Sequence, residues 1–182
     1  HHTTLAIDAQ LIADYGSTNL WPLIDLSNIA QGASVLAIYL LHKKNKKEAE
    51  ISVPATISAW LGVTEPAMFG INLKYLYPFI AAMIGSGVAG MVSTLMGVRA
   101  NAIGVGGLPG ILAIRGEDML KFILPMVIAI IVPIVLTFFF RQAGIFNKND
   151  LVGAGDVNYT SDSATLEGAQ NIAKTEISKG TL

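Results

Sequence analysis

Two long apolar stretches without charged residues stand out in the hydropathy pattern of the chain. Residues 75–96 carry no charge, and residues 122–140 are apolar except for Thr137. About 20 consecutive apolar residues are enough for a helix to cross a bilayer, so each stretch is predicted to span a membrane. The small residues at 85–90 favour close helix packing, and Pro125 and Pro133 predict kinks.

A third charge-free stretch, residues 26–41, has a polar first half and several small residues. This composition suits a membrane helix that packs against other helices, and such a helix can be longer than the stretch itself. The stretch is followed by His42 and, in residues 43–47, by four lysines. A lysine cluster beside a span is typical of the cytoplasmic side, and the alternative of an ordinary solvated loop gives the same topology.

Residues 51–72 form a shorter apolar segment with a single carboxylate, Glu65, which is followed at once by Pro66. Its apolar part before Glu65, residues 51–63, would reach only ~20 Å as a helix, whereas a bilayer core is ~30 Å thick. An acid at membrane depth is costly and marks a functional site by default. The pattern therefore predicts a helical segment that reaches only partway across the membrane, with Glu65 at its tip.

Counting the crossings gives the path of this segment. If the lysine loop and the polar tail after Arg141 are both cytoplasmic, an even number of crossings separates them, and residues 75–96 and 122–140 already supply two. Residues 51–72 are then a re-entrant hairpin with Glu65 and Pro66 near its turn. Arg99 and Arg115 would lie outside, which runs against the positive-inside rule. The expected fold class is an all-α integral membrane protein, a helical transporter with a re-entrant hairpin.

Residues 104–110 are rich in glycine, but Pro109 stands where a phosphate-binding fingerprint needs glycine. Irregular backbone at membrane depth occurs only where protein buries it or where it lines a water-filled cavity. Two interpretations stay open: this loop is either one wall of a polar pathway or an ordinary external loop.

Composition supports a membrane protein and narrows the chemistry. Hydrophobic residues make up 52% of the 182 residues, charged residues make up 14%, and the net charge of −1 argues against nucleic acid as a partner. The chain has no cysteine, which excludes thiolate catalysis and cysteine metal sites. We expect no metal and no cofactor, and the polar residues 146–182 are expected to be a linker or tail. The abrupt start at His1 suggests a piece of a longer protein.

The candidate binding residues are few. Glu65, with Thr64 beside it, can accept hydrogen bonds from the hydroxyls of a polar solute, or it is a structural carboxylate in headgroups or paired with Lys74. His1 and His2 are a tag remnant, a surface pair or part of a site. No catalytic triad can be recognised.

Several motifs together resemble the C-terminal half of the membrane component, enzyme IIC, of sugar phosphotransferase system permeases. They are residues 1–8 (His-His-Thr-Thr-Leu-Ala-Ile-Asp), 19–22 (Asn-Leu-Trp-Pro), 26–31 (Leu-Ser-Asn-Ile-Ala-Gln), 57–74 with Gly-Val-Thr-Glu-Pro, and 101–110. The similarity covers residues 1–145, which would be the partial enzyme IIC domain. Within the glucose superfamily the chain is most similar to trehalose permeases, with sucrose permeases next.

The resemblance implies a homodimeric, multi-pass transporter in lipid of the bacterial cytoplasmic membrane, with a cytoplasmic tail. It takes up a disaccharide, trehalose or sucrose, which receives phosphate from a cysteine of enzyme IIB that enzyme IIA has charged. Glu65 and one of His1 and His2 would bind sugar hydroxyls. Because this chain has no cysteine, it would be the translocating part of the phosphotransferase without the donor and without a catalytic residue. Residues 146–182 resemble a linker to a fused enzyme IIA domain, and the N-terminal membrane helices would lie outside the chain.

Two other classes of function compete with this interpretation. An ion-coupled transporter would use Glu65 as a proton carrier, since acids within membranes commonly relay protons. A membrane scaffold without transport activity would need Glu65 only for assembly.

Overall fold

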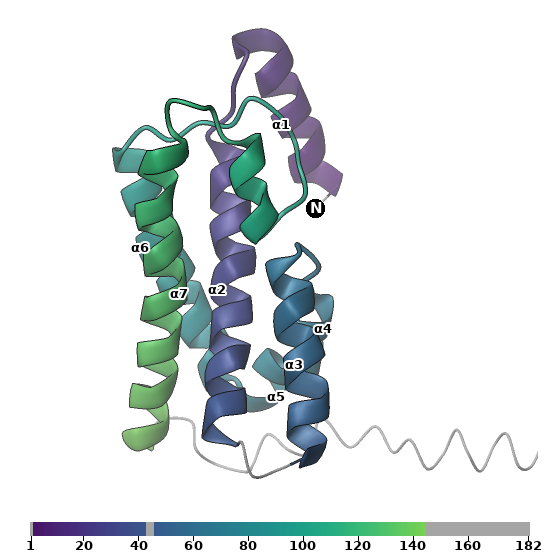
Figure 1. Cartoon of the computed structure of the whole chain (residues 1–182), viewed down its shortest axis with the longest axis vertical. Helices are drawn as coiled ribbons and strands as arrows, with labels where there is room; N and C mark the ends of the chain where they lie inside the picture. Colours follow the sequence, from purple (N-terminus) through teal and green to yellow (C-terminus); the bar gives the residue numbers. More distant parts are fainter. Residues whose placement is uncertain (1, 43–45, 145–182) are drawn as a thin grey trace, which may run out of the picture. The chain divides into compact units, whose positions relative to one another are not determined.

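The computed structural model describes residues 2–42 and 46–144, and this part of the chain is helical with no strand. Isolated bridges pair Thr18 with Ala100 and Ala100 with Ile114. The result confirms an all-α fold. The elements in Figure 1 are α1 (His2–Tyr15), α2 (Leu20–Leu41), α3 (Lys46–Trp60), α4 (Glu65–Ala67), the π-helix η1 (Met68–Asn72), α5 (Leu73–Tyr75), α6 (Tyr77–Leu95), the 3₁₀-helix η2 (Leu108–Ala113) and α7 (Met119–Gln142).

Three of these helices, α2, α6 and α7, are long and apolar enough to cross a membrane. They agree with the three predicted spans in position, length and composition. The first helix begins at Leu20 and not at residue 26, because Asp25 is buried within it instead of marking its end. Large apolar side chains remain on the surface of the other two, such as Leu95 and Leu120, each 81% exposed. Such a surface suits a lipid environment.

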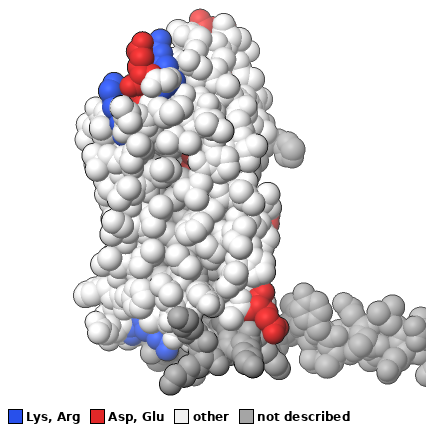
Figure 2. All heavy atoms as spheres, viewed as in Figure 1, with Lys and Arg blue, Asp and Glu red and all other residues white. Residues whose placement is uncertain are grey.

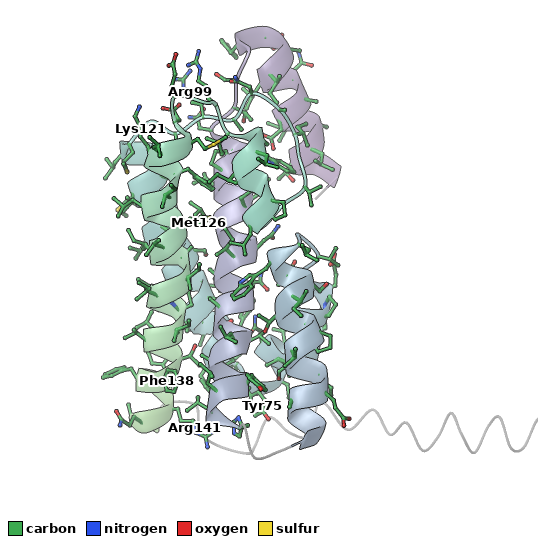
Figure 3. The ribbon with its side chains drawn as sticks, in the orientation of Figure 1. Tyr75, Arg99, Lys121, Met126, Phe138 and Arg141 are labelled. Atoms are coloured by element: carbon green, nitrogen blue, oxygen red, sulfur yellow. The ribbon has the colours of Figure 1, made fainter. Side chains whose placement is uncertain are left out.

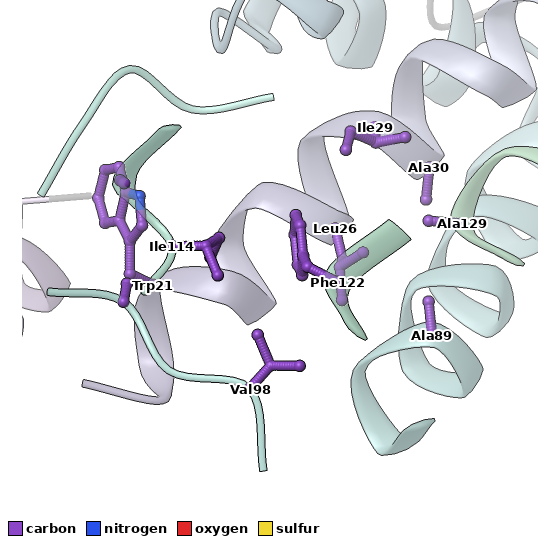
Figure 4. Packing of buried hydrophobic residues seen from close by; sticks show 11 residues of the cluster. Trp21, Leu26, Ile29, Ala30, Ala89, Val98, Ile114, Phe122 and Ala129 are labelled. Carbon is purple, nitrogen blue, oxygen red and sulfur yellow. The ribbon is translucent and has the colours of Figure 1, made fainter. Parts of the chain in front are cut away.

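Helix α2 lies at the centre of the bundle and packs against α6 and α7. The core between these three helices and the residues that join them includes Leu26 and Ile29 of α2, Ala89 of α6 and Phe122 of α7, all without exposed surface (Figure 4). Small residues let the backbones approach, as expected from residues 85–90. A Cβ atom at Gly85 would overlap the ring of Pro133.

The segment after α2 forms a helical hairpin. Its first arm, α3, is 15 residues long and its return arm consists of α4, η1 and α5. At about 1.5 Å per residue α3 reaches ~22 Å, whereas the 22 residues of α2 reach ~33 Å. In Figure 1, α3 starts beside the end of α2 and stops about midway along it. The predicted helical hairpin is present, and Glu65 is the first residue of the return arm.

Two hydrogen bonds fix both arms of the hairpin to α2. The Trp60 indole Nε1 donates to the carbonyl oxygen of Ile29 at 3.3 Å, and the Ser34 hydroxyl donates to Asn72 Oδ1 at 3.0 Å. A second apolar core fills the space between them, made of Val35, Ile38, Ala55, Ala59, Ala67, Ile71 and Tyr77. The turn of the hairpin is therefore held at a defined height along α2.

Charged side chains gather at the two ends of the bundle, and the face seen in Figure 2 is nearly free of them in between. Arg99 and Lys121 lie at one end, and Tyr75 and Arg141 lie at the other (Figure 3). The Arg141 Nη1 atom lies 2.8 Å from His42 Nε2. The end of α7 and the start of the lysine segment thus share one end of the bundle, as the crossing count requires. Residues 145–182, with the predicted linker, lie outside the described residues.

Candidate functional site

A pocket of about 300 Å³ opens between α2 and the turn of the hairpin. Its polar lining comes from both sides: α2 contributes Ser27, Asn28 and Gln31, and the turn contributes Thr64 and Glu65. Its apolar lining residues are Ile24, Met68 and Phe69. This volume lies at the lower end of the range for small-molecule sites, which is about 300–1,000 Å³.

The end of α3 explains why Glu65 lies at this pocket. The Val63 N–H donates to the Ser58 carbonyl oxygen and the Gly62 N–H to that of Ala59, which is the hydrogen-bond pattern of a Schellman motif. The motif needs a left-handed residue, and Gly62 supplies it with φ +98°. The chain therefore reverses at a glycine, three residues before Glu65.

Thr64, Glu65 and Pro66 start the return arm in succession. Thr64 is the N-cap residue of α4 and is buried, and Pro66 occupies the first turn, where no backbone N–H is needed. Glu65 is exposed at the pocket and not buried as its apolar sequence surroundings suggested, because the first residue of the return arm lies at the open side of the turn. Its alternative partner, Lys74, is on α5, where its Nζ lies 5.2 Å from the centre of the Tyr75 ring.

The histidine pair is only partly placed. His1 lies outside the described residues, and His2 begins α1 but its side chain is not described. In the view of Figure 1 the N-terminal end of α1 is directed toward the hairpin turn. The Thr18 hydroxyl, which donates to Asp8 Oδ1 at 2.6 Å, ties α1 to the start of α2.

The glycine-rich loop packs between α2 and the hairpin turn at residues 106–110, while residues 101–105 are exposed. A Cβ atom at Gly110 would overlap the carboxylate of Asp25, and one at Gly107 would overlap the carbonyl oxygen of Trp60. The backbone of Gly106 faces Gly62 and the amide of Asn28. Residues 106–110 are thus packed against α2 and the hairpin turn, beside the pocket.

Sequence reasoning missed Asp25, Asn28 and Gln31. Asp25 has no exposed surface and lies against the glycine-rich loop. Asp25 stands between Ile24 and Leu26, so it is also an acid with apolar neighbours in a membrane segment, which by default marks a functional site. The positions of Ser27, Asn28 and Gln31 also signal one polar face of a helix, because residues i and i+4 lie on the same side.

Comparison with known proteins identifies a family. Residues 1–86 match the family model described as "Phosphotransferase system, EIIC". This range contains α1, α2 and the complete hairpin, and so it contains both walls of the pocket.

Curated relatives extend the similarity. The chain is 63% identical over 142 residues to the PTS system trehalose-specific EIIBC component of Escherichia coli (strain K12), and 48% identical over 143 residues to that of Bacillus subtilis (strain 168); each alignment covers 78% of this chain and 30% of the relative. The sucrose-specific EIIBC component of Staphylococcus xylosus is 47% identical over 121 residues, 65% of this chain and 25% of the relative. The chain thus spans less than a third of the length of these relatives. No solved structure matches it significantly.

Proposed function

Because the chain belongs to the phosphotransferase system EIIC family, we propose that it is the sugar-translocating part of a permease that takes up a disaccharide and presents it for phosphorylation. The observation that carries this proposal is the pocket at mid-height of the bundle, where Glu65 of the hairpin turn faces polar side chains of α2. The names of the two trehalose-specific relatives favour trehalose as the substrate, with sucrose as the alternative.

The residues of the turn have separate tasks in this proposal. The Glu65 carboxylate accepts hydrogen bonds from sugar hydroxyls, and such charge-assisted bonds are short and strong. Thr64 adds a hydroxyl beside it, Pro66 holds the start of the return arm, and an imidazole of His1 or His2 completes the site. All four of these tasks are in binding and positioning, and none of these residues reacts with the sugar.

The phosphate comes from another domain. In the proposed reaction a sugar hydroxyl oxygen attacks the phosphorus of a phosphocysteine on enzyme IIB, the bond between sulfur and phosphorus breaks, the cysteine leaves as a thiolate, and the hydroxyl proton is released to that thiolate or to solvent. Enzyme IIA then supplies the next phosphate to that cysteine. The absence of cysteine from these 182 residues and the EIIBC names of the relatives support a donor outside this chain.

The proposed setting is the bacterial cytoplasmic membrane, with residues 1–145 as the enzyme IIC part and residues 146–182 as a cytoplasmic linker toward enzyme IIA. The pairing of Arg141 with His42 beside the lysine segment supports a cytoplasmic position for that end of the bundle. The intact permease is proposed to be a homodimer in which the hairpin-bearing unit moves between outward-facing and inward-facing positions.

Uptake and phosphorylation by the intact permease test this function. Cells or vesicles that contain it receive labelled trehalose, sucrose and maltose, with and without the phosphotransfer proteins. We expect trehalose to accumulate as a phosphate, only when the phosphotransfer proteins are present, and without effect of an uncoupler. Uptake of free sugar that collapses with the uncoupler and survives loss of those proteins would instead show an ion-coupled transporter.

A further inference from the structure

The wall of the pocket opposite Glu65 is formed by Asn28 and Gln31 of α2, and we propose that these two side chains are sugar-binding residues. The inference rests on the proposed function and adds a second set of hydroxyl contacts to it. The sugar would then bridge α2 and the hairpin turn instead of being held by the turn alone.

The placement of these residues is unusual for a membrane helix. Ser27, Asn28 and Gln31 all line the pocket, in a helix whose neighbouring side chains form the apolar cores of the bundle. Asn28 is only 4% exposed and Gln31 is half-buried. Polar side chains at such depth cost stability unless they are hydrogen-bonded.

A second feature of both pocket-lining side chains is an unsatisfied atom. Asn28 Nδ2 and Gln31 Oε1 are buried and have no hydrogen-bond partner among the described residues. Native proteins satisfy the large majority of buried polar atoms, so an exception calls for a physical reason. Both atoms lack accessible surface in this structure, and both residues line the pocket, so the proposal includes a rotation of each side chain that turns the atom toward a ligand there.

The chemistry of the three polar groups matches a sugar hydroxyl. A hydroxyl donates one hydrogen bond and accepts others, and the pocket offers both kinds of partner. After this rotation the Asn28 amide nitrogen donates to a hydroxyl oxygen, while Gln31 Oε1 and the Glu65 carboxylate accept hydroxyl protons. Ile24 and Phe69 add apolar surface for the C–H faces of a sugar ring.

The test measures trehalose affinity and melting temperature of the purified intact permease for wild type, Asn28→Leu and Gln31→Met. Each substitution removes an unsatisfied polar atom and keeps an apolar side chain of similar size. We expect the dissociation constant to rise at least tenfold, while the melting temperature without sugar stays unchanged or rises because no buried atom is left unpaired.

Asn72→Leu is the matched control. Asn72 is also an asparagine without exposed surface and with an unpaired Nδ2, but it does not line the pocket, and its Oδ1 accepts the hydrogen bond from Ser34. We expect this variant to lower the melting temperature and to leave the affinity of the folded protein within about twofold. The proposal is overturned if Asn28→Leu and Gln31→Met keep wild-type affinity, or if they lower the melting temperature as Asn72→Leu does.

Two comparisons separate this inference from the proposed function. If wild type binds no disaccharide, the proposed function itself fails. If wild type binds trehalose and Glu65→Gln weakens binding while Asn28→Leu and Gln31→Met do not, only this inference fails. A panel of monodeoxy trehaloses provides a second readout. The analogue that lacks the hydroxyl bound by Gln31 should bind to wild type more weakly than trehalose does, but it should bind to Gln31→Met with the same affinity as trehalose. If every analogue loses the same factor of affinity in wild type and in Gln31→Met, the contact between Gln31 and a sugar hydroxyl is contradicted.

Discussion

Gly62 and Gly107 determine where Glu65 lies, because the backbone of both residues has a positive φ and both are in close contact with another backbone segment. Gly62 has φ +98° and Gly107 has φ +81°. A Cβ atom at Gly62 would lie 2.8 Å from the carbonyl oxygen of Gly106, and one at Gly107 would overlap that of Trp60. The hairpin turn and the glycine-rich loop are therefore in direct backbone contact, without room for side chains between them.

Substitution of Gly62 by alanine tests this fit. Gly97 provides the control, because it also has a positive φ of +67° but has nothing within 4 Å of the position of a Cβ atom. Left-handed backbone costs a non-glycine residue roughly 1–2 kcal/mol, so both variants should lose about that much stability. Gly62→Ala should lose more in thermal denaturation and should also bind sugar more weakly. Equal losses in the two variants would contradict the backbone contact.

At the residue scale, sequence reasoning found one wall of the pocket and missed the other. Glu65 stood out because it interrupts an apolar segment, and this property is local in sequence. Asn28 and Gln31 did not stand out, since polar residues in a membrane helix are equally consistent with contacts between helices. Only the folded chain shows that Gln31 Oε1 is left without a partner, because that depends on residues far away in sequence.

At the scale of elements, α2 forms one wall of the pocket and also supports the hairpin that forms the other wall. It packs against α6 and α7 on one side and holds the hairpin through Ile29 and Ser34. The contact between α6 and α7 is close at Gly85, which faces Pro133.

Gly85→Ala and Gly87→Ala test the packing of α6 on α7. A methyl group at Gly85 would overlap Pro133, whereas one at Gly87 meets nothing within 4 Å. Overpacking costs typically ~1–3 kcal/mol, so Gly85→Ala should lower the melting temperature of the intact protein. Gly87→Ala should not, since alanine is the better helix former. A loss of stability in Gly87→Ala equal to that in Gly85→Ala would argue against this helix contact.

Asp118, the N-cap residue of α7, provides a prediction about pH. The Lys121 ammonium donates to Asp118 Oδ1 at 2.8 Å and holds the pKa of that carboxyl below its ordinary value. A lowered pKa in the folded state means that the charged form stabilises the fold above the ordinary carboxyl pKa of about 4 and that this contribution is lost as the pH falls.

The variant Asp118→Asn should therefore be slightly less stable than wild type at pH 7. The difference should stay below ~1 kcal/mol because Lys121 is half-exposed, and it should shrink as the pH falls below about 4. Denaturation of both proteins over a pH series measures it. A difference that is the same at pH 7 and pH 3 would show that the charge pair has no role.

The elements themselves were largely predictable. Long apolar runs mark spans reliably because a bilayer demands a minimum length, and the hairpin followed from the short length of its apolar part and the crossing count. The first turns of α2, the π-helix η1 and the 3₁₀-helix η2 were not predicted. Their boundaries depend on buried contacts such as that of Asp25 with Gly110 rather than on local hydropathy.

At the scale of the whole molecule, the bundle combines three span-length helices with a hairpin that ends about midway along α2 (Figure 1). This geometry brings a carboxylate to mid-height without burying it inside a helix, since Glu65 lies at a turn that opens on a pocket. The arrangement suits a solute that is bound between the two faces of a membrane. The geometry provides a site for a polar solute, and family membership supports the proposal that this solute is a sugar.

The most direct test of the central proposal is the affinity of the intact permease for labelled trehalose with Glu65→Gln. Glu50→Gln is the control, because Glu50 is another exposed glutamate of the hairpin and lies at the base of α3, away from the pocket. Loss of a charge-assisted hydrogen bond costs about 1.5–3 kcal/mol, so Glu65→Gln should bind roughly 10- to 100-fold more weakly at an unchanged melting temperature, and Glu50→Gln should bind as wild type does. Wild-type affinity in a folded Glu65→Gln protein would contradict the assignment of Glu65 to the sugar site.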